Sequence, residues 1–338
     1  MIDNPAQLAY AERLKQSSGN APLVFLKIDG GYHRAGVIPE SGLASALTKS
    51  ILQSETDGNV KFLGLYIHAG HSYETRKDWQ ALEYLLDEFT ILGRTAEELG
   101  LISSRSSLTL SVGASPTATS LQHPDIIRIG SEDSTSNSSN NTCSSLRYEL
   151  DTLKGKGFKL EVHAGVYPTL DLQQLATHAR DLSLLSCSDI AISILADVVS
   201  LYPGRGESGT TEALINVGCL GLGREPCQDM GSEKGVHYNG WGIPMPWPDS
   251  FNNPAPGPGF PAIHGGWQVG KISQEHGIMK WRGDPAEEIP LKVGQRIRIW
   301  PNHACIAGSG FGHYLVVDSR KKGAEDIVID VWQRWSGW

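Results

Sequence analysis

Apolar runs alternate with amphipathic segments through the first half of the chain, and no other feature constrains the fold as strongly. Four runs are predicted strands: 21–29, 60–67, 108–112 and 159–163. The first has the near-continuous apolar character of a strand buried on both faces of a parallel sheet. Segments 41–53 and 74–92, which lie between strands, carry apolar residues at helical spacing. This order of strands and helices predicts an α/β unit built around a parallel sheet.

The character of the sequence changes near Asp189. From there to the C-terminus, short β-prone runs alternate with Gly and Pro turns, which predicts an all-β domain. We therefore predict two domains, residues 1–188 and residues 189–338. Within the first domain, residues 131–145 consist almost entirely of Ser, Asn, Thr, Asp and Glu, and such a segment cannot bury a core. We expect residues 131–145 to form a disordered insertion.

The composition excludes several classes of partner and favours a small-molecule substrate. The 338 residues carry a formal net charge of -8, and no basic block interleaved with aromatic residues occurs, which argues against a nucleic-acid partner. No apolar run reaches the length of a membrane span, and the N-terminal residues lack the pattern of a signal peptide. The five cysteines are odd in number and fit no disulfide framework, which favours a reducing compartment, most simply the cytoplasm.

Each predicted strand of the first domain ends in a polar, glycine-rich segment. The four segments are 29–36 (DGGYHRAG), 68–73 (HAGHSY), 111–117 (SVGASPT) and 163–167 (HAGVY). Catalytic groups of parallel α/β folds collect at the carboxyl ends of strands, and glycines beside hydroxyl groups let backbone N–H groups approach a phosphate. Turn formation explains each segment alone. Four such endings in succession, rich in His, Tyr and Arg, indicate a binding site.

The segment PNHAC places His303 and Cys305 two residues apart in the second domain. If the segment is extended, the two side chains point to the same face. An imidazole nitrogen and a thiolate on one face form half of a tetrahedral metal site, which zinc usually occupies. The alternative is that His303 is a hydrogen-bonded histidine and Cys305 a small buried side chain.

The chain resembles a known family of enzymes. The segments KIDGGYHRAG, YIHAGHSY, SVGASPT and HAGVYPTLD, with QEHG and PNHAC further on, are similar to those of eukaryotic D-serine dehydratases. These enzymes belong with D-threonine aldolases to the pyridoxal-phosphate enzymes of the alanine-racemase type. The resemblance extends from Met1 almost to Trp338. It implies a (β/α)8 barrel, here incomplete at its N-terminal end, followed by a C-terminal β-domain that carries a zinc site.

The resemblance also implies roles for individual residues. It implies that His303 and Cys305 bind zinc, and Cys305 favours the dehydratases because aldolases are expected to carry an acidic residue there. The residues implied around the cofactor phosphate are Ser111, Gly113, Ala114, Ser115, Gly165 and Tyr167. The residues implied near the cofactor ring or the substrate, as the catalytic set, are Arg34, His68, Tyr73, Glu275 and His276. For Arg34, Tyr73 and His276, a surface or ion-pair role is the alternative.

The activity that the resemblance implies is a β-elimination. A lyase dependent on pyridoxal 5'-phosphate and Zn2+ would convert D-serine to pyruvate and ammonia, and the family suggests a homodimer. One alternative is a D-threonine aldolase or a lyase for another 3-hydroxy-D-amino acid. Another is a non-catalytic protein that keeps the amino-acid or cofactor pocket.

One expected element of such an enzyme does not occur in the 338 residues. The family's cofactor-binding lysine lies on the first barrel strand, within a segment of the Arg-Pro-His-x-Lys-Thr type, and no such segment is present. Lys27 matches a different position of the family. We predict four strands after Met1, where the family has eight, and expect about the first three to be absent. We therefore expect this chain alone to be inactive or poorly folded.

Overall fold

The protein forms two compact units, which are described separately. The computed structural model describes residues 1–102, 107–123, 126, 138–180, 185, 187–228, 238–245, 266–318, 320–321, 324 and 326–335. Unit 1 comprises Met1–Gly165 and Thr177–Asp181, and unit 2 comprises Val166–Ala176 and Leu182–Trp338. Segment 166–176 precedes the predicted domain boundary at residue 188 but belongs to unit 2, because the Asp171 carboxylate accepts a hydrogen bond from the Ala304 N–H (2.9 Å).

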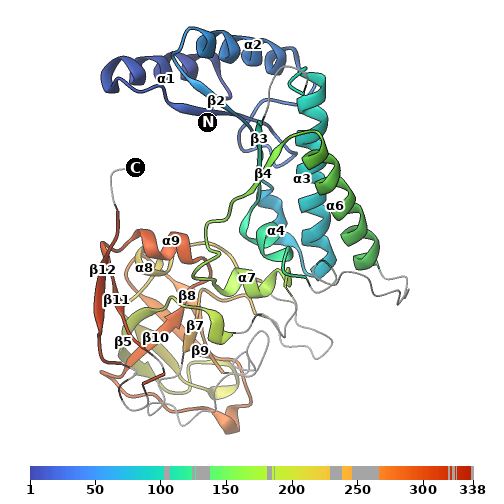
Figure 1. Ribbon diagram of the computed structural model, residues 1–338. Coiled ribbons are helices and arrows are strands. Elements are labelled where there is room, and N and C mark those ends of the chain that lie inside the picture. Colours follow the sequence, from blue (N-terminus) through green and yellow to red (C-terminus); the bar gives the residue numbers. More distant parts are fainter. Residues whose placement is uncertain are drawn as a thin grey trace. The chain divides into compact units, whose positions relative to one another are not determined.

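Unit 1 is an α/β structure around a four-stranded parallel sheet (Figure 1). Its strands are β1 (Leu23–Lys27), β2 (Lys61–Tyr66), β3 (Thr109–Val112) and β4 (Lys159–Val162), side by side in chain order. Its helices are α1 (Pro5–Ser18), α2 (Gly42–Thr56), η1 (Gly70–Glu74), α3 (Asp78–Glu98), α4 (Ser115–Ser120) and α6 (Ser138–Gly155). The predicted parallel α/β unit is therefore confirmed.

One face of this sheet packs on the helices through apolar side chains. Leu26, Leu65 and Leu110 come from three neighbouring strands, are fully buried, and join Leu47 of α2 and Leu85 of α3 in one core. Because side chains alternate along a strand, the residues next to these leucines face the opposite side of the sheet. That second face carries the candidate site.

Helix α6 corrects one prediction. Residues 131–137 of the predicted disordered insertion lie outside the described residues, but residues 138–145 form the first turns of α6. Cys143, Leu146 and Leu153 are buried there, and α6 lies beside α3 (Figure 1). These apolar residues recur at helical intervals and bury one face of the helix, and the polar composition of the segment concealed that stripe.

Unit 2 is an antiparallel β-structure, which confirms the predicted C-terminal β-domain. Six of its strands form a sheet in the order β7-β10-β5-β6-β9-β8, and β11 pairs with β12. The strands are β5 (Ile194–Tyr202), β6 (Glu212–Ile215), β7 (Ile243–Met245), β8 (Trp267–Ile272), β9 (Gly277–Trp281), β10 (Arg296–Trp300), β11 (His313–Val316) and β12 (Asp330–Gln333). The helical turns are α7 (Leu172–Ala176), η2 (Cys187–Asp189), η3 (Glu207–Gly209), α8 (Cys219–Leu222), η5 (Pro285–Glu287) and α9 (Ala304–Ser309).

Two backbone hydrogen bonds join the ends of the six-stranded sheet. The Trp241 N–H donates to the Val269 carbonyl (2.8 Å), and the Val269 N–H donates to the Gly242 carbonyl (3.0 Å). The segment leading into β7 thereby pairs with β8, so the sheet closes in the manner of a barrel around buried residues such as Met279 and Ile297. Among the helices of the described residues, none is long and apolar enough to cross a membrane.

Candidate functional site

A row of polar side chains crosses the face of the unit 1 sheet that lies opposite the apolar core. The row consists of residues that are register partners on neighbouring strands: Lys27, Tyr66, Ser111 and Glu161. Residues two positions further along three of the strands face the same side, since the side-chain period of a strand is two. They are His68, Gly113 and His163. Two layers of functional groups thus lie at the carboxyl ends of the strands, where the sequence predicted a site.

Ser111 connects the two layers. Its hydroxyl donates a hydrogen bond to Glu161 Oε1 (2.6 Å), and its oxygen lies 3.0 Å from Nδ1 of His163. The His163 ring stacks on the Tyr66 ring, with 4.1 Å between centroids and 10° between planes. His163 Nε2 is buried and has no hydrogen-bond partner among the described residues. Burial first, and then the charges of His68 and Lys27, lower the pKa of His163 to about 4, against a smaller opposing effect of the Gly113 backbone.

His68 is fixed by the strand-end loop next to it. Its Nδ1 donates to the Gly113 carbonyl oxygen (2.8 Å). Burial is the main cause that lowers the pKa of His68, and the positive charges of Arg34 and Lys27 add to it. Both imidazoles of the site are therefore neutral at neutral pH. Gly113 itself has φ +135°, and a Cβ at this position would overlap the carbonyl oxygen of His163, so the close approach of β3 to β4 requires glycine.

Glu88 of α3 holds two strand-end loops together, and sequence reasoning missed it. The side chain is 2% exposed, and Oε1 accepts hydrogen bonds from the N–H groups of Ala69 (2.8 Å) and Gly113 (3.1 Å). Burial raises its pKa to about 7, although these hydrogen bonds oppose the shift. The sequence does carry a signal for it: Glu88 falls between Leu85 and Leu92 on the apolar stripe of α3, where a carboxylate is expected to be buried.

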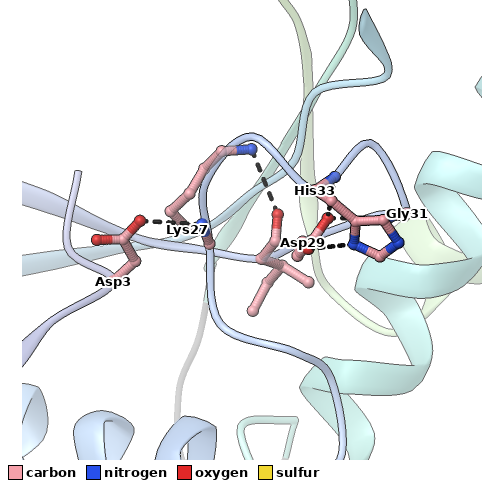
Figure 2. Close-up of polar contacts among 7 residues, drawn as sticks. Asp3, Lys27, Asp29, Gly31 and His33 are labelled. Carbon is pink, nitrogen blue, oxygen red and sulfur yellow. Dashed lines mark hydrogen bonds and ion pairs between the residues drawn. The ribbon is translucent and has the colours of Figure 1, made fainter. Parts of the chain in front are cut away.

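Lys27 is the cationic member of the polar row. It is 7% exposed, its Nζ lies 5.0 Å from the centroid of the Tyr66 ring, and it donates to the Ile28 carbonyl (3.3 Å; Figure 2). Burial first, and the charge of Arg34 second, lower its pKa to about 8. Because most molecules keep the proton at neutral pH, Lys27 places a positive charge beside the two neutral imidazoles.

The loop after β1 is shaped by Asp29, as Figure 2 shows. Asp29 Oδ1 accepts from the N–H groups of Gly31 and His33 (both 3.0 Å), and Oδ2 lies 2.9 Å from His33 Nδ1. His33 adopts a left-handed backbone conformation with φ 57° to make these contacts. The loop carries Arg34, which is exposed, with Cζ 5.6 Å from the centroid of the Tyr32 ring.

Three of the predicted residues of unit 1 meet in this site: His68, Ser111 and Gly113. Two predicted phosphate contacts compete with contacts inside the protein, since the Gly113 N–H donates to Glu88 and the Ala114 N–H to Thr117 Oγ1 (2.8 Å). The other predicted residues of unit 1 lie in strand-end segments: Arg34 after β1, Tyr73 in η1, Ser115 at the start of α4 and Gly165 after β4. Their roles stay predictions.

In unit 2, the geometry on which the metal prediction was argued is wrong. His303 is extended, with φ -131°, but it is the residue before α9, and Cys305 is the second residue of that helix. The alternation of an extended segment therefore does not apply to this pair. Cys305 is an exposed residue, but desolvation of its thiol, followed by the effect of the Asp171 carboxylate, raises the pKa of the thiol, and Arg334 opposes both. Among the described residues, no group of three or more His, Cys, Asp or Glu side chains could hold a metal ion.

His303 nevertheless has the proton arrangement of a metal ligand. Its Nδ1 lies 2.6 Å from Gln173 Oε1, and because an amide oxygen only accepts, Nδ1 carries the proton. Nε2 is then deprotonated, which is the state in which an imidazole binds a metal. Burial lowers the pKa of His303 and favours this neutral form.

Two buried polar residues fix the backbone around His303. Asp171 is fully buried, and its carboxylate accepts from the N–H groups of Ala304 and Gln174 (both 2.9 Å). Burial raises the pKa of Asp171 to about 7. Asn302 is 2% exposed and accepts a hydrogen bond from the Tyr238 hydroxyl (2.7 Å). His303 thus lies between two residues that are held in place, Asn302 before it and Ala304 after it.

The remaining predicted residues of unit 2 are accessible. Glu275 and His276 are exposed in the turn between β8 and β9, and Tyr167 is 43% exposed in the segment before α7. Their predicted roles in a shared cleft and at a phosphate stay predictions.

Comparison with known proteins identifies relatives of both units. Residues 1–131 match the family described as alanine racemase, N-terminal domain, and residues 191–317 match the family described as putative serine dehydratase domain. The whole chain is 34% identical to a D-serine dehydratase of Schizosaccharomyces pombe, of which it spans 67%. It is 30% identical to a D-serine dehydratase of Saccharomyces cerevisiae, of which it spans 68%.

A solved structure has the same fold as the chain. The D-threo-3-hydroxyaspartate dehydratase from Delftia sp. HT23 is 24% identical, and the alignment covers all of this chain and 72% of that one with a TM-score of 0.64. At this identity the likeness shows the fold, which is an alanine racemase-like α/β domain followed by an antiparallel β-domain.

Proposed function

The chain belongs to the D-serine dehydratase family. We propose that it carries the active-site residues of a lyase that removes the β-hydroxyl of a 3-hydroxy-D-amino acid. D-Serine is the proposed substrate, and pyruvate and ammonia are the products. The observation that carries the proposal is the identity of 34% with a D-serine dehydratase along the entire chain. The polar rows at the strand ends of unit 1 and the state of His303 in unit 2 support it.

Pyridoxal 5'-phosphate is the proposed cofactor of unit 1, and the polar face of the sheet fits it. When bound, this cofactor supplies an electron sink for the charge that develops at Cα of the substrate. Lys27 and Arg34 provide positive charge for an anionic ligand, and His163 offers a buried nitrogen that has no hydrogen-bond partner among the described residues. Because Gly113 has no Cβ, the His163 backbone can lie against it, and the Gly113 carbonyl accepts the hydrogen bond that orients His68.

Zinc is the proposed metal of unit 2, with His303 and Cys305 as ligands. When bound, zinc supplies a Lewis acid for the departing hydroxyl group. Gln173 fixes the tautomer that leaves His303 Nε2 deprotonated, as second-shell partners of metal-binding histidines generally do. Because the described residues contain no third side-chain ligand at this place, the proposed pair requires further ligands, such as water or substrate.

Zinc content tests this pair of ligands directly. We expect His303→Ala and Cys305→Ala each to abolish bound zinc, and Gln173→Leu to weaken zinc binding by about tenfold to a hundredfold, because the imidazole loses its orienting acceptor. Metal analysis after dialysis against a chelator series gives the affinity. Cys219→Ala, which removes another cysteine of unit 2, is the control. Unchanged zinc in the first two variants would exclude the site.

Two other functions remain distinguishable by product analysis. A dehydratase converts D-threonine to a keto acid, whereas an aldolase releases glycine and acetaldehyde. Cys305, where an acidic residue is expected in the aldolases, favours the dehydratase. A non-catalytic binding protein would bind D-serine, measured by calorimetry, without releasing any product.

We expect the 338-residue chain alone not to turn over substrate. Its sequence has no counterpart of the family's cofactor-binding lysine segment. Lys27 lies on the polar face, but it matches a different position of the family, and its Nζ donates a hydrogen bond to the Ile28 carbonyl. An enzyme of this class needs a primary amine to take the α-proton. Visible absorbance from lysine-bound cofactor, or pyruvate released by the purified chain without any added amine, would refute this part of the proposal.

A further inference from the structure

The hydrogen-bond chain Glu161–Ser111–His163 fixes the position of one proton. A serine hydroxyl has one proton, and that of Ser111 is directed at Glu161 Oε1, 2.6 Å away. Ser111 Oγ can then only accept from His163 Nδ1, at 3.0 Å. Nδ1 therefore carries the imidazole proton, and Nε2 carries a lone pair.

The surroundings of Nε2 show that the part of the chain described by the structure does not use this lone pair. The atom is buried, and no described residue gives it a hydrogen bond. Buried polar atoms in proteins are nearly always satisfied by protein, water or ligand. The ring stacks on Tyr66, so one of its faces is occupied. What remains of His163 is an in-plane acceptor on the polar face of the sheet.

We propose that His163 Nε2 accepts a hydrogen bond from a donor group of the ligand of unit 1, and that Ser111 and Glu161 are positioning residues that keep this nitrogen deprotonated. The inference that the ligand is pyridoxal 5'-phosphate rests on the proposed function, but the position of the proton does not. The lowered pKa of His163, about 4, agrees with a neutral acceptor at neutral pH. Ser111 thereby has a role other than the predicted contact with the phosphate.

The direction of the hydrogen bonds from His163 through Ser111 to Glu161 determines which variant tests the proposal. Glu161→Met removes the acceptor but keeps the length of the side chain, so the Ser111 hydroxyl can turn and donate to His163 Nδ1. The imidazole proton must then move to Nε2. Lys159→Met is the matched control, because Lys159 is two residues earlier on β4, points to the same side, and is exposed like Glu161. Both sites are exposed, and circular dichroism checks that both variants fold.

Long-range nitrogen–proton NMR of the ¹⁵N-histidine-labelled chain without ligand gives the first result. His163 is assigned by the signal that disappears in His163→Gln. We expect a deprotonated Nε2 in the unmodified protein and in Lys159→Met, and a protonated Nε2 in Glu161→Met. A protonated Nε2 in the unmodified protein, or an unchanged pattern in Glu161→Met, would overturn the assignment of the positioning residues.

Binding of pyridoxal 5'-phosphate gives the second result. Adding the cofactor should shift the Nε2 signal of the unmodified protein, and its dissociation constant should rise about threefold to tenfold in Glu161→Met, as expected for one lost hydrogen bond. Lys159→Met should retain the affinity of the unmodified chain. Equal affinity of Glu161→Met and the unmodified chain would refute the acceptor role. If the cofactor does not bind even the unmodified chain, while the proton of His163 is on Nδ1 as expected, the proposed cofactor is refuted. The role of Ser111 and Glu161 as positioning residues would not be refuted by that result.

Discussion

Asp171→Ala is expected to lower the free energy of unfolding of unit 2 by about 3 to 5 kcal/mol. The fully buried carboxylate accepts from the Ala304 and Gln174 N–H groups, and alanine would leave these donors buried without partners. The loss also releases the start of α9, so the proposed binding of zinc by His303 should weaken as stability falls. Urea unfolding followed by tryptophan fluorescence measures the effect, because Trp79 is the one tryptophan that precedes unit 2.

Asp171→Asn is the control for this variant. The asparagine amide has one oxygen for the two N–H donors, Ala304 and Gln174. We therefore expect the free energy of unfolding to fall by about 1 to 2 kcal/mol. An Asp171→Ala protein as stable as the unmodified chain would show that the contacts of Asp171 do not hold α7 and α9 together. A stable variant that lost zinc would assign Asp171 to the metal site alone.

Glu88 is expected to make unit 1 less stable as the pH rises. Its pKa is raised to about 7 in the folded protein, against an ordinary value of 4.5. The folded state therefore binds the proton of Glu88 more strongly than the unfolded state does. The resulting contribution of Glu88 to the free energy of unfolding is complete below about pH 4.5 and is lost as the pH rises through about 7. The shift corresponds to about 3 kcal/mol between pH 4.5 and pH 8.

Glu88→Gln isolates this contribution, because glutamine keeps an oxygen for Ala69 and Gly113 but cannot titrate. Hydrogen exchange of peptides from β2 and β3, measured at pH 5 and pH 8 and corrected for the intrinsic exchange rate, reports unit 1 separately from unit 2. We expect the unmodified protein to lose more stability than Glu88→Gln over this interval. The same loss in both proteins would contradict the assignment.

The alternation of strands and helices was predictable from sequence because it depends on local apolar patterns. The four strands of unit 1 lie where the apolar runs 21–29, 60–67, 108–112 and 159–163 placed them, and the β-prone second half forms the antiparallel unit 2. Helix α6 was not predicted, since seven of the eight residues 138–145 are polar and outweighed one buried cysteine in any measure of composition.

The site was predictable only in part. His68 and His163 follow β2 and β4, the two strands that flank β3 in the parallel sheet, and their rings come within 6.2 Å of each other, centroid to centroid. The proton position of His163 depends on Ser111 of β3 as well as on Glu161 of β4, and that of His303 depends on Gln173 of α7, so no local pattern encodes either position. Asp171 is buried only once the chain has folded, whereas the place of Glu88 on the apolar stripe of α3 was a local signal that sequence reasoning missed. The helical start at Ala304 removed the extended geometry assumed for His303 and Cys305.

Pyruvate release is the measurement that tests the proposed lyase most directly. The purified chain, supplied with pyridoxal 5'-phosphate and zinc, is given D-serine or L-serine, each with and without ethylamine, a primary amine that stands in for the lysine side chain. We expect pyruvate from D-serine in the presence of ethylamine, none without it, little from L-serine, and none from His303→Ala. Equal amounts from the two enantiomers, or no pyruvate from D-serine under either condition, would contradict the proposed function.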